Sequence, residues 1–216
     1  MKKNLIPIIL FECSCPKATS LTEVPTQDCP IDLKQIQRYG FQRGGTSFNT
    51  GGTPASDIKL LADWQVYRTA SDDTKIIVSP LIGADPVINA GDAITTGGGD
   101  NSTLNGVEEN EGTNPSGASA TFKSLSPEKA MKSLICEPDL TVYLFLQGGR
   151  VVAKKITADA EYEGIPIQSF FFSDRNNDGF GTKDTFNMSF QLPAGWSEDI
   201  EILDAVDLDF NPLTDL

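Results

Sequence analysis

The chain has 216 residues, with 30 acidic residues against 17 Lys and Arg and no histidine, which gives a net charge of −13. This length predicts one domain, or one domain with a large insertion, that can bury a core without disulfides or metal ions. Because histidine is absent, the sequence excludes Ser-His-Asp catalysis, Cys-His catalysis and most catalytic zinc sites.

The negative charge argues against nucleic-acid and membrane-surface partners. A nucleic-acid-binding protein needs a basic footprint, and the longest basic cluster here is Lys154-Lys155. The stretch from Glu198 to Leu216 holds seven acids and no base. We interpret it as a solvated face; the functional alternative is an acidic surface past which a polyanion moves without sticking. No segment reaches the roughly 18 apolar residues of a membrane-spanning helix.

The four cysteines, Cys13, Cys15, Cys29 and Cys136, fit no structural zinc site. Cys13 and Cys15 lie closer together than a CxxC pair, and there is no second pair and no histidine. We expect free thiols in a reducing compartment, with a disulfide to Cys29 only if the protein is exported. Cys136 has no base beside it, so we expect a buried apolar thiol rather than a nucleophile.

The first residues imitate a secretory signal. Two lysines precede an apolar run from Leu5 to Phe11, but the run is short, contains a proline and is followed directly by Glu12. We therefore expect an N-terminal β-strand, buried on both faces or added to a neighbour's sheet edge; a cleaved signal is the alternative. Residues 1–50, low in core residues, are predicted to form an extended arm.

The domain that follows is predicted to span residues 51–216. Residues 56–67 suit a short helix with Ser56 as its N-cap, and residues 75–79 suit a β-strand. Residues 83–117 are rich in glycine and contain no aromatic residue and no lysine, so a phosphate-binding loop is excluded. We expect this long segment to be a flexible hairpin or an inter-subunit loop.

The second half of the chain carries the clearest elements. The helix predicted over 126–137 has Ser126 as N-cap, Pro127 at its first position and an apolar stripe from Ala130 to Ile135. The spacing also predicts six strand segments. They are 119–123, 140–146 and 150–156 joined as a hairpin through Gln147-Gly148-Gly149, 165–172, 186–192 and 200–203. The fold class is therefore mainly β (α+β), a β-sandwich or barrel with one packed helix.

Two groups of acidic residues invite a functional interpretation. Asp174, Asn176 and Asp178, followed by Gly179, match the first half of a calcium-binding loop, but Thr185 stands where the bidentate acid belongs. A polar hairpin turn is the alternative, so we assign no metal ligand. The other carboxylates (Glu108, Glu109, Glu111, Glu161 and Glu163) lie on loops or strand ends, and we interpret them as solvated charge rather than as a glycosidase pair. We name no catalytic or cofactor-binding residue.

The order of elements resembles the tail tube proteins of long-tailed bacteriophages. The resemblance covers roughly residues 55–195. It is carried by the strands 75–80 and 119–123, the segment 97–107, the helix 127–137 and the hairpin 140–156. It implies a non-enzymatic virion subunit, assembled in the host cytoplasm, that self-associates into stacked hexameric rings. The rings would also contact other virion proteins. DNA would pass through without specific binding, no cofactor would be needed and no membrane would be involved.

Two alternatives remain open. The long predicted arm also suits a head-decoration or head–tail connector protein of a phage. The signal-like start and the calcium-like loop suit an exported bacterial surface protein with an adhesin-like β-sandwich.

Overall fold

The computed structural model describes residues 33, 35–99, 102–123, 128–157, 161–177 and 179–216. Internal contacts divide the chain into Met1–Ile31 and Asp32–Leu216, and every element below belongs to the second unit. The predicted N-terminal strand and Cys13, Cys15 and Cys29 lie outside the described residues.

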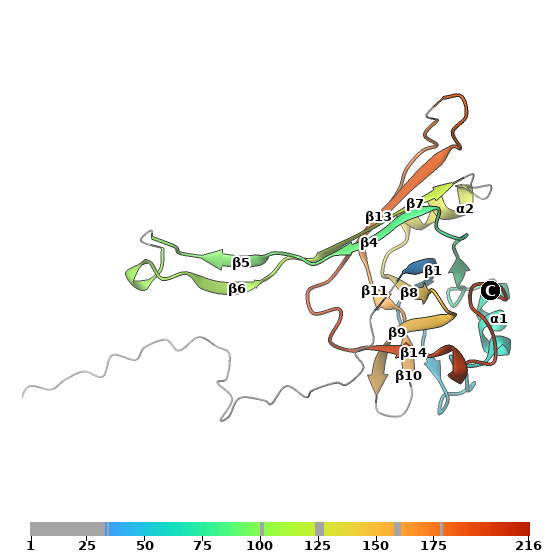
Figure 1. Cartoon of the computed structure of the whole chain (residues 1–216). Helices are drawn as coiled ribbons and strands as arrows, with labels where there is room; N and C mark the ends of the chain where they lie inside the picture. Colours follow the sequence, from blue (N-terminus) through green and yellow to red (C-terminus); the bar gives the residue numbers. More distant parts are fainter. Residues whose placement is uncertain (1–32, 34, 100–101, 124–127, 158–160, 178) are drawn as a thin grey trace, which may run out of the picture. The chain divides into compact units, whose positions relative to one another are not determined.

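The larger of two main sheets is antiparallel, with strand order β2-β10-β9-β8-β1-β3 (Figure 1). Two further strands join it, because β11 also pairs with β8 and β14 pairs with β9. The strands are β1 (Ile36–Arg43), β2 (Phe48–Asn49), β3 (Ile77–Val78), β8 (Leu140–Leu146), β9 (Arg150–Thr157), β10 (Glu161–Glu163), β11 (Ile165–Pro166) and β14 (Ile200–Leu203).

The second sheet has the order β12-β13-β7-β4, and a separate two-stranded sheet pairs β5 with β6. These strands are β4 (Ala84–Asn89), β5 (Ala93–Thr96), β6 (Glu109–Thr113), β7 (Ser116–Lys123), β12 (Gln168–Phe172) and β13 (Thr185–Leu192). The helices are α1 (Leu61–Thr69) and α2 (Glu128–Ser133), with 3₁₀ turns at Leu104–Gly106, Leu134–Cys136 and Ala205–Asp207. The mainly β fold predicted from the sequence is confirmed.

Strand β8 belongs to two hydrophobic cores at once. All seven of its residues are buried. Because successive side chains of a strand point to opposite faces, Leu144 and its even-numbered neighbours enter the core between the two sheets. Tyr143 and Phe145 enter a second core on the other face of the larger sheet. The uninterrupted apolar run of β8 is thereby explained.

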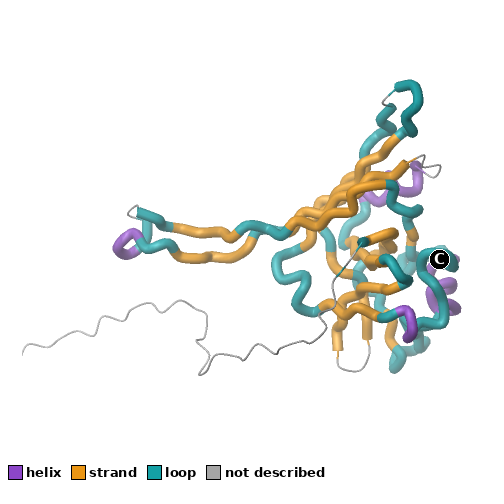
Figure 2. Tube along the Cα trace, in the orientation of Figure 1, coloured by secondary structure: helices purple, strands orange, loops and turns teal. Residues whose placement is uncertain are grey.

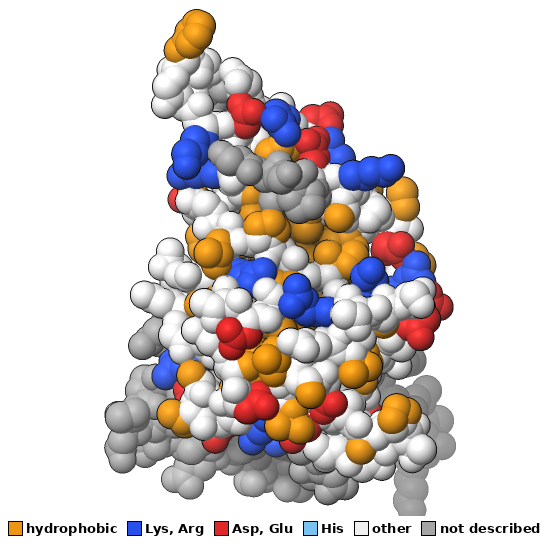
Figure 3. Space-filling view, turned by 90° about the vertical axis from the view of Figure 1, so that its right-hand side faces the viewer, with side chains coloured by type: hydrophobic (Ala, Val, Ile, Leu, Met, Phe, Trp, Pro, Cys, Tyr) orange, Lys and Arg blue, Asp and Glu red, His pale blue; other side chains and the backbone are white. Residues whose placement is uncertain are grey.

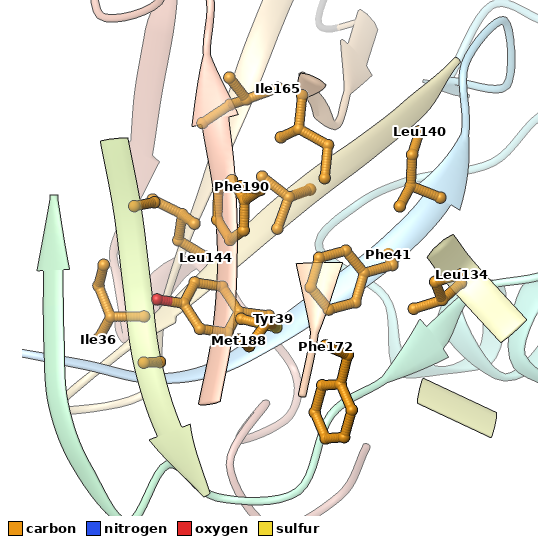
Figure 4. Close-up of a cluster of buried hydrophobic side chains, with 14 of the residues drawn as sticks. Ile36, Tyr39, Phe41, Leu134, Leu140, Leu144, Ile165, Phe172, Met188 and Phe190 are labelled. Carbon is orange, nitrogen blue, oxygen red and sulfur yellow. The ribbon is translucent and has the colours of Figure 1, made fainter. Parts of the chain in front are cut away.

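The first core lies between the two main sheets and is rich in aromatic rings. The Tyr39 and Phe190 rings meet edge-on with their centroids 5.6 Å apart, and the Phe41 and Phe170 rings do so at 5.2 Å. Figure 4 shows Tyr39 and Phe41 of β1 close to Phe190 of β13. These edge-to-face contacts join the two sheets.

The second core packs α1 and the C-terminal segment onto the larger sheet. The Trp64 ring lies at its centre, 4.7 Å from the ring of Phe48 and 5.2 Å from that of Tyr143, measured between centroids. The Trp64 indole N–H donates to the carbonyl of Ile58 at 2.7 Å. Leu208, Phe210 and Leu216 complete the core.

The start of α1 differs from the prediction. Ser56 does not cap the helix, which begins after Leu60; its hydroxyl instead accepts the backbone N–H of Asn49 at 3.1 Å. The first helical N–H, that of Leu61, donates at 2.7 Å to the carboxylate of Asp209, 148 residues away in the chain. A carboxylate is favourable at this helix end because of the helix dipole.

The prediction that residues 1–50 form an extended arm is wrong for residues 36–49. Ile36–Arg43 forms the central strand β1, and Phe48–Asn49 forms β2 at the edge of the same sheet. The core character of this segment has little local signal, because Tyr39 and Phe41 are its only aromatic core residues before Phe48 and are separated by glycine. Both side chains are almost completely buried.

The predicted helix over 126–137 is shorter than expected, and Ser126 and Pro127 lie outside the described residues. Helix α2 gives way at Leu134 to a 3₁₀ turn that ends at Cys136, before Pro138. Met131 and Leu134 are buried as the stripe predicts, whereas Ala130 and Ile135 are exposed. The tighter turn also leaves Cys136 exposed, so the expectation of a buried thiol is wrong.

The strand predicted over 165–172 is two strands in two sheets. Residues Ile165–Pro166 pair with β8 in the larger sheet, and Gln168–Phe172 pair with β13 in the second sheet. Phe172 is buried, whereas Phe171 is about half exposed. The hairpin 140–156, the inward face of 186–192 and the strand 200–203 are confirmed.

The Tyr39 hydroxyl is buried and has no hydrogen-bond partner among the described residues. Burial raises the pKa of Tyr39, so the group stays neutral but unsatisfied. Tyr39→Phe is expected to raise the free energy of unfolding by about 1 kcal/mol, because it removes an uncompensated polar group. Urea denaturation monitored by fluorescence measures the change.

Tyr143→Phe is the matched control. The Tyr143 hydroxyl is equally buried but donates to the side-chain carbonyl of Gln42 at 3.1 Å. This substitution is expected to lower the free energy of unfolding by about 1 kcal/mol. The interpretation of Tyr39 is wrong if both substitutions destabilise the protein equally.

Candidate interaction site: two projecting hairpins and a pocket

A long β-hairpin projects from the second sheet. Strand β4 leads into β5, the chain turns through residues 97–108, and β6 leads back into β7 (Figures 1 and 2). We call residues 92–114 the arm from here on; it is distinct from the N-terminal arm predicted over residues 1–50. The predicted flexible hairpin or inter-subunit loop over 83–117 is therefore a hairpin with regular strands at its base, which join the second sheet.

The arm is exposed, and its composition is one-sided. Every residue of β6 is exposed, and so are the apolar side chains of Ile94, Leu104 and Val107. Residues 92–114 contain five acids and no Lys or Arg. Because β5 and β6 pair only with each other, each has an unpaired outer edge in the described structure. An isolated two-stranded hairpin is marginally stable in water, and free strand edges readily pair with another chain.

The base of the arm depends on close backbone approach. A Cβ atom added to Gly91 would lie 1.8 Å from the carbonyl oxygen of Asn114. Directly beyond this crossing, the Asn114 N–H donates to the carbonyl of Asp92 at 2.8 Å. Because glycine has no Cβ atom, position 91 allows the two chain segments at the base of the arm to lie this close together.

The second projection is the hairpin tip between β12 and β13, residues 173–185. It holds the calcium-like segment considered in the sequence, and the acids described there bind cations and amides of the chain. The Asp174 carboxylate pairs with Lys132, which holds the pKa of Asp174 below its usual value. The Asp184 carboxylate accepts the Asn177 side-chain N–H at 2.7 Å and pairs with Arg175.

The two carboxylates described in this tip, those of Asp174 and Asp184, are thus bound by neighbouring cations and by an amide. Asn176 is joined to Thr185 by reciprocal backbone hydrogen bonds of 2.9 Å, as in a hairpin turn, and Asp178 lies outside the described residues. Among the described residues no group of three His, Cys, Asp or Glu side chains could hold a metal ion.

Phe180 stands at the end of this second projection and is fully exposed. It lies between Gly179 and Gly181, both in the left-handed region with φ of 97° and 86°. The Thr182 hydroxyl donates to the Gly179 carbonyl, and the Gly179 N–H donates to the Asn177 side chain, each at 3.0 Å. Figure 3 shows hydrophobic colour at the far end of the projection.

The two projections leave opposite ends of the second sheet. In the pairing of β13 with β7, Leu192 faces Ser116, where the arm begins, and Thr185 faces Lys123, beside the Phe180 hairpin. The same continuous strands therefore support both projections.

A pocket of about 300 Å³ lies where β1, β3 and the 3₁₀ turn after α2 meet. Its apolar lining comes from Phe41, Ile77, Leu134 and Leu140. Ion pairs of Arg43 with Asp73 and with Glu137 lie at its rim, and the Arg43 Nε donates to Glu137 at 2.6 Å. Asp72, Lys75 and Ser133 also line the pocket.

The remaining charged candidates from the sequence serve the fold. Lys154 pairs with Glu163 at 3.0 Å, and Lys155 pairs with Glu201 at 2.7 Å, so both lysines of this basic pair are neutralised. Burial disfavours the charged form of Glu201, but hydrogen bonds from Lys155 and Tyr162 outweigh it and lower the pKa of Glu201.

Other acids of the chain are divided between pairing and solvent. Glu161 accepts a hydrogen bond from the Ser47 hydroxyl at 2.7 Å, and Asp204 pairs with Arg150 at 2.8 Å. The three glutamates of the arm are exposed, as predicted for solvated charge. The stretch from Glu198 to Asp215 is thus partly structural, since Glu201, Asp204 and Asp209 each bind a named group.

Neither helix in the described part of the chain has the length and apolar character that crossing a bilayer demands. Comparison with protein-family models, curated proteins and solved structures finds no match to this chain. The two projections and the pocket are therefore the features from which we argue function.

Gly91→Ala is expected to destabilise the protein by about 1–3 kcal/mol, because the new methyl group overlaps the Asn114 carbonyl and the strands must separate. Gly117→Ala, in the neighbouring strand, meets no atom within 4 Å and serves as the control. Its free energy of unfolding should change by less than about 0.5 kcal/mol. Equal effects of the two substitutions in urea denaturation would contradict the proposed role of Gly91.

Proposed function

We propose that this chain is a non-enzymatic structural subunit of a phage particle that forms the stacked rings of a tail tube. The observation that carries the proposal is the arm: an exposed two-stranded hairpin that carries acids but no Lys or Arg and has unpaired edges, held on a fold with two cores. Such an arm has little to stabilise it in a monomer and suits contact with a neighbouring subunit.

Ring formation supplies partners for the strand edges. In the described structure β4 and β12 are the outer strands of the second sheet. In the larger sheet β2 and β3 end the strand order, and β14, four residues long, pairs only with β9. Soluble proteins protect such edges, and a closed ring of identical subunits can cover them by repeating one contact. β3 and β2 are only two residues long, so the second sheet offers the more extended edges.

The arm then reaches beyond its own ring. Its exposed apolar residues Ile94, Leu104 and Val107 provide contact area, and its acids restrict which surfaces it can approach. Contact between arms and the next ring would stack the rings into a tube.

The net charge of −13 supports passive conduction of DNA. Phosphates are repelled by acidic surfaces, so DNA inside a tube with an acidic lumen stays mobile. Specific grip on DNA would need basic residues, but Lys154 and Lys155 are already paired with acids.

Negative-stain electron microscopy of the purified full chain at increasing concentration tests the proposal. Rings and stacked tubes are expected. Rings that never stack would favour the head-decoration or connector alternative. A monomer at every concentration would overturn the proposal, and a native protein whose first residue lies near Cys13 would favour the exported surface protein.

Shortening the arm separates stacking from folding. Residues 93–113, none of which belongs to either core, are replaced by Asn-Gly so that the Asp92–Asn114 hydrogen bond is kept. We expect an unchanged melting temperature and rings without tubes.

Asn105→Gly in the full-length arm is the control for this deletion. Asn105 has a positive φ of 61°, which glycine adopts readily, so this variant should fold and stack like the wild type. Tubes formed by the shortened variant would contradict the stacking role of the arm.

A further inference from the structure

Phe180 is an apolar side chain that the fold presents to solvent. It is the most exposed of the large hydrophobic residues described. Full burial of a phenylalanine is favourable by roughly 1.5–3 kcal/mol relative to exposure, so leaving it exposed forgoes that gain. Hydrogen bonds from the Gly179 N–H and from the Thr182 hydroxyl shape the turn that presents the ring. Aromatic side chains, phenylalanine included, are enriched in protein interfaces relative to the rest of the surface.

The pocket beside the end of β1 is of a size and chemistry that accept such a ring. An apolar protein cavity of about 150 Å³ holds a benzene molecule, and this pocket measures about 300 Å³. Phe41, Leu134 and Leu140 at its base are themselves almost completely buried, so an entering ring would extend an existing core.

The charges beside the ring and the pocket are complementary. Lys183 lies three residues after Phe180 and is exposed, and among the described residues no acid forms an ion pair with it. Asp72 at the pocket rim is also exposed and without a cation in the described structure. Its carboxylate accepts the backbone N–H of Thr74 at 3.0 Å and the Thr74 hydroxyl at 2.6 Å. These bonds hold the pKa of Asp72 below its usual value and keep it ionised.

We propose that Phe180 of one subunit inserts into the pocket lined by Phe41, Leu134 and Leu140 of a second copy of this chain, with Lys183 paired to Asp72. The proposal rests on the self-association proposed above and names one contact within it. The Phe180 side chain (the knob) and the pocket are separate sets of residues, so one copy can use its knob on one neighbour and its pocket on another, which makes the contact heterologous. A contact of this kind builds a ring when its rotation closes and a filament when it does not.

Two variants that each remove one half of the contact test it. Phe180→Ala removes the knob and leaves the pocket, whereas Ser133→Trp blocks the pocket and leaves the knob. Each variant alone should assemble only at concentrations at least about 30-fold above those of the wild type, as expected for loss of an interface anchor. Sedimentation velocity across a concentration series measures the shift.

Val206→Ala is the control for Phe180→Ala. Val206 is also a large, almost fully exposed apolar residue, but it lies in the 3₁₀ turn Ala205–Asp207, away from the Phe180 hairpin and the pocket lining. This variant should assemble like the wild type. If Ser133→Trp fails to fold by circular dichroism, Ser71→Trp, also at the pocket, replaces it.

Mixing the two variants gives the sharpest result. The free knob of Ser133→Trp should enter the free pocket of Phe180→Ala, and growth should stop at a 1:1 dimer because no further knob and pocket remain. Lys183→Glu and Asp72→Lys should each weaken assembly, and their combination in one chain should restore it.

Several results would overturn the inference. If the wild type forms rings and Phe180→Ala forms them equally well, the knob serves a different partner, and the proposed tube function stands. Separately impaired variants that do not dimerise on mixing also overturn it. A wild type that stays monomeric at every concentration overturns both the inference and the proposed function.

Discussion

The structure depends on one strand being buried on both faces. Strand β8 provides alternate side chains to the core between the sheets and to the core under α1, so neither core exists without it. It is paired on either side by β1 and β9 and is therefore held in register by its backbone as well as by its side chains. A strand in this position cannot slip by one residue, because Tyr143 and Leu144 would exchange cores. The rest of the fold is arranged around this fixed element.

A sheet fixed in this way can hold features that are unfavourable by themselves. The second sheet packs on the larger one through the Tyr39, Phe41 and Phe190 rings, and it extends at both ends into hairpins that contribute no residue to either core. One hairpin exposes acids and free strand edges, and the other exposes Phe180. Both are tolerated because the two cores supply the stability, and the self-association that we propose would give both a use.

Much of the fold could be predicted from the sequence where local patterns decide the structure. The hairpin 140–156 and the alternation of Phe186 to Leu192 follow from the strand period and from glycine at a turn. Predictions failed where a distant residue decides the outcome. Ser56 has the right chemistry for a cap, but Asp209 reaches α1 from the far end of the chain. The pairing of β1 with β8 spans about a hundred residues, so residues 36–49 carried no local sign of their place in the core. The candidate interaction site could not be predicted for the same reason, because the pocket is assembled from three separate segments and the exposure of Phe180 is a property of the folded loop.

The hydrogen bond from Leu61 to Asp209 also bears on the order in which the chain folds during synthesis. Helix α1 leaves the ribosome long before Asp209, and its first turn lacks this carboxylate until residue 209 has been made. The second core, which needs Leu208, Phe210 and Leu216, must close after α1 has emerged for the same reason. Contacts of such long sequence separation slow folding. A nascent chain would therefore keep its second core open until Leu216 has left the ribosome.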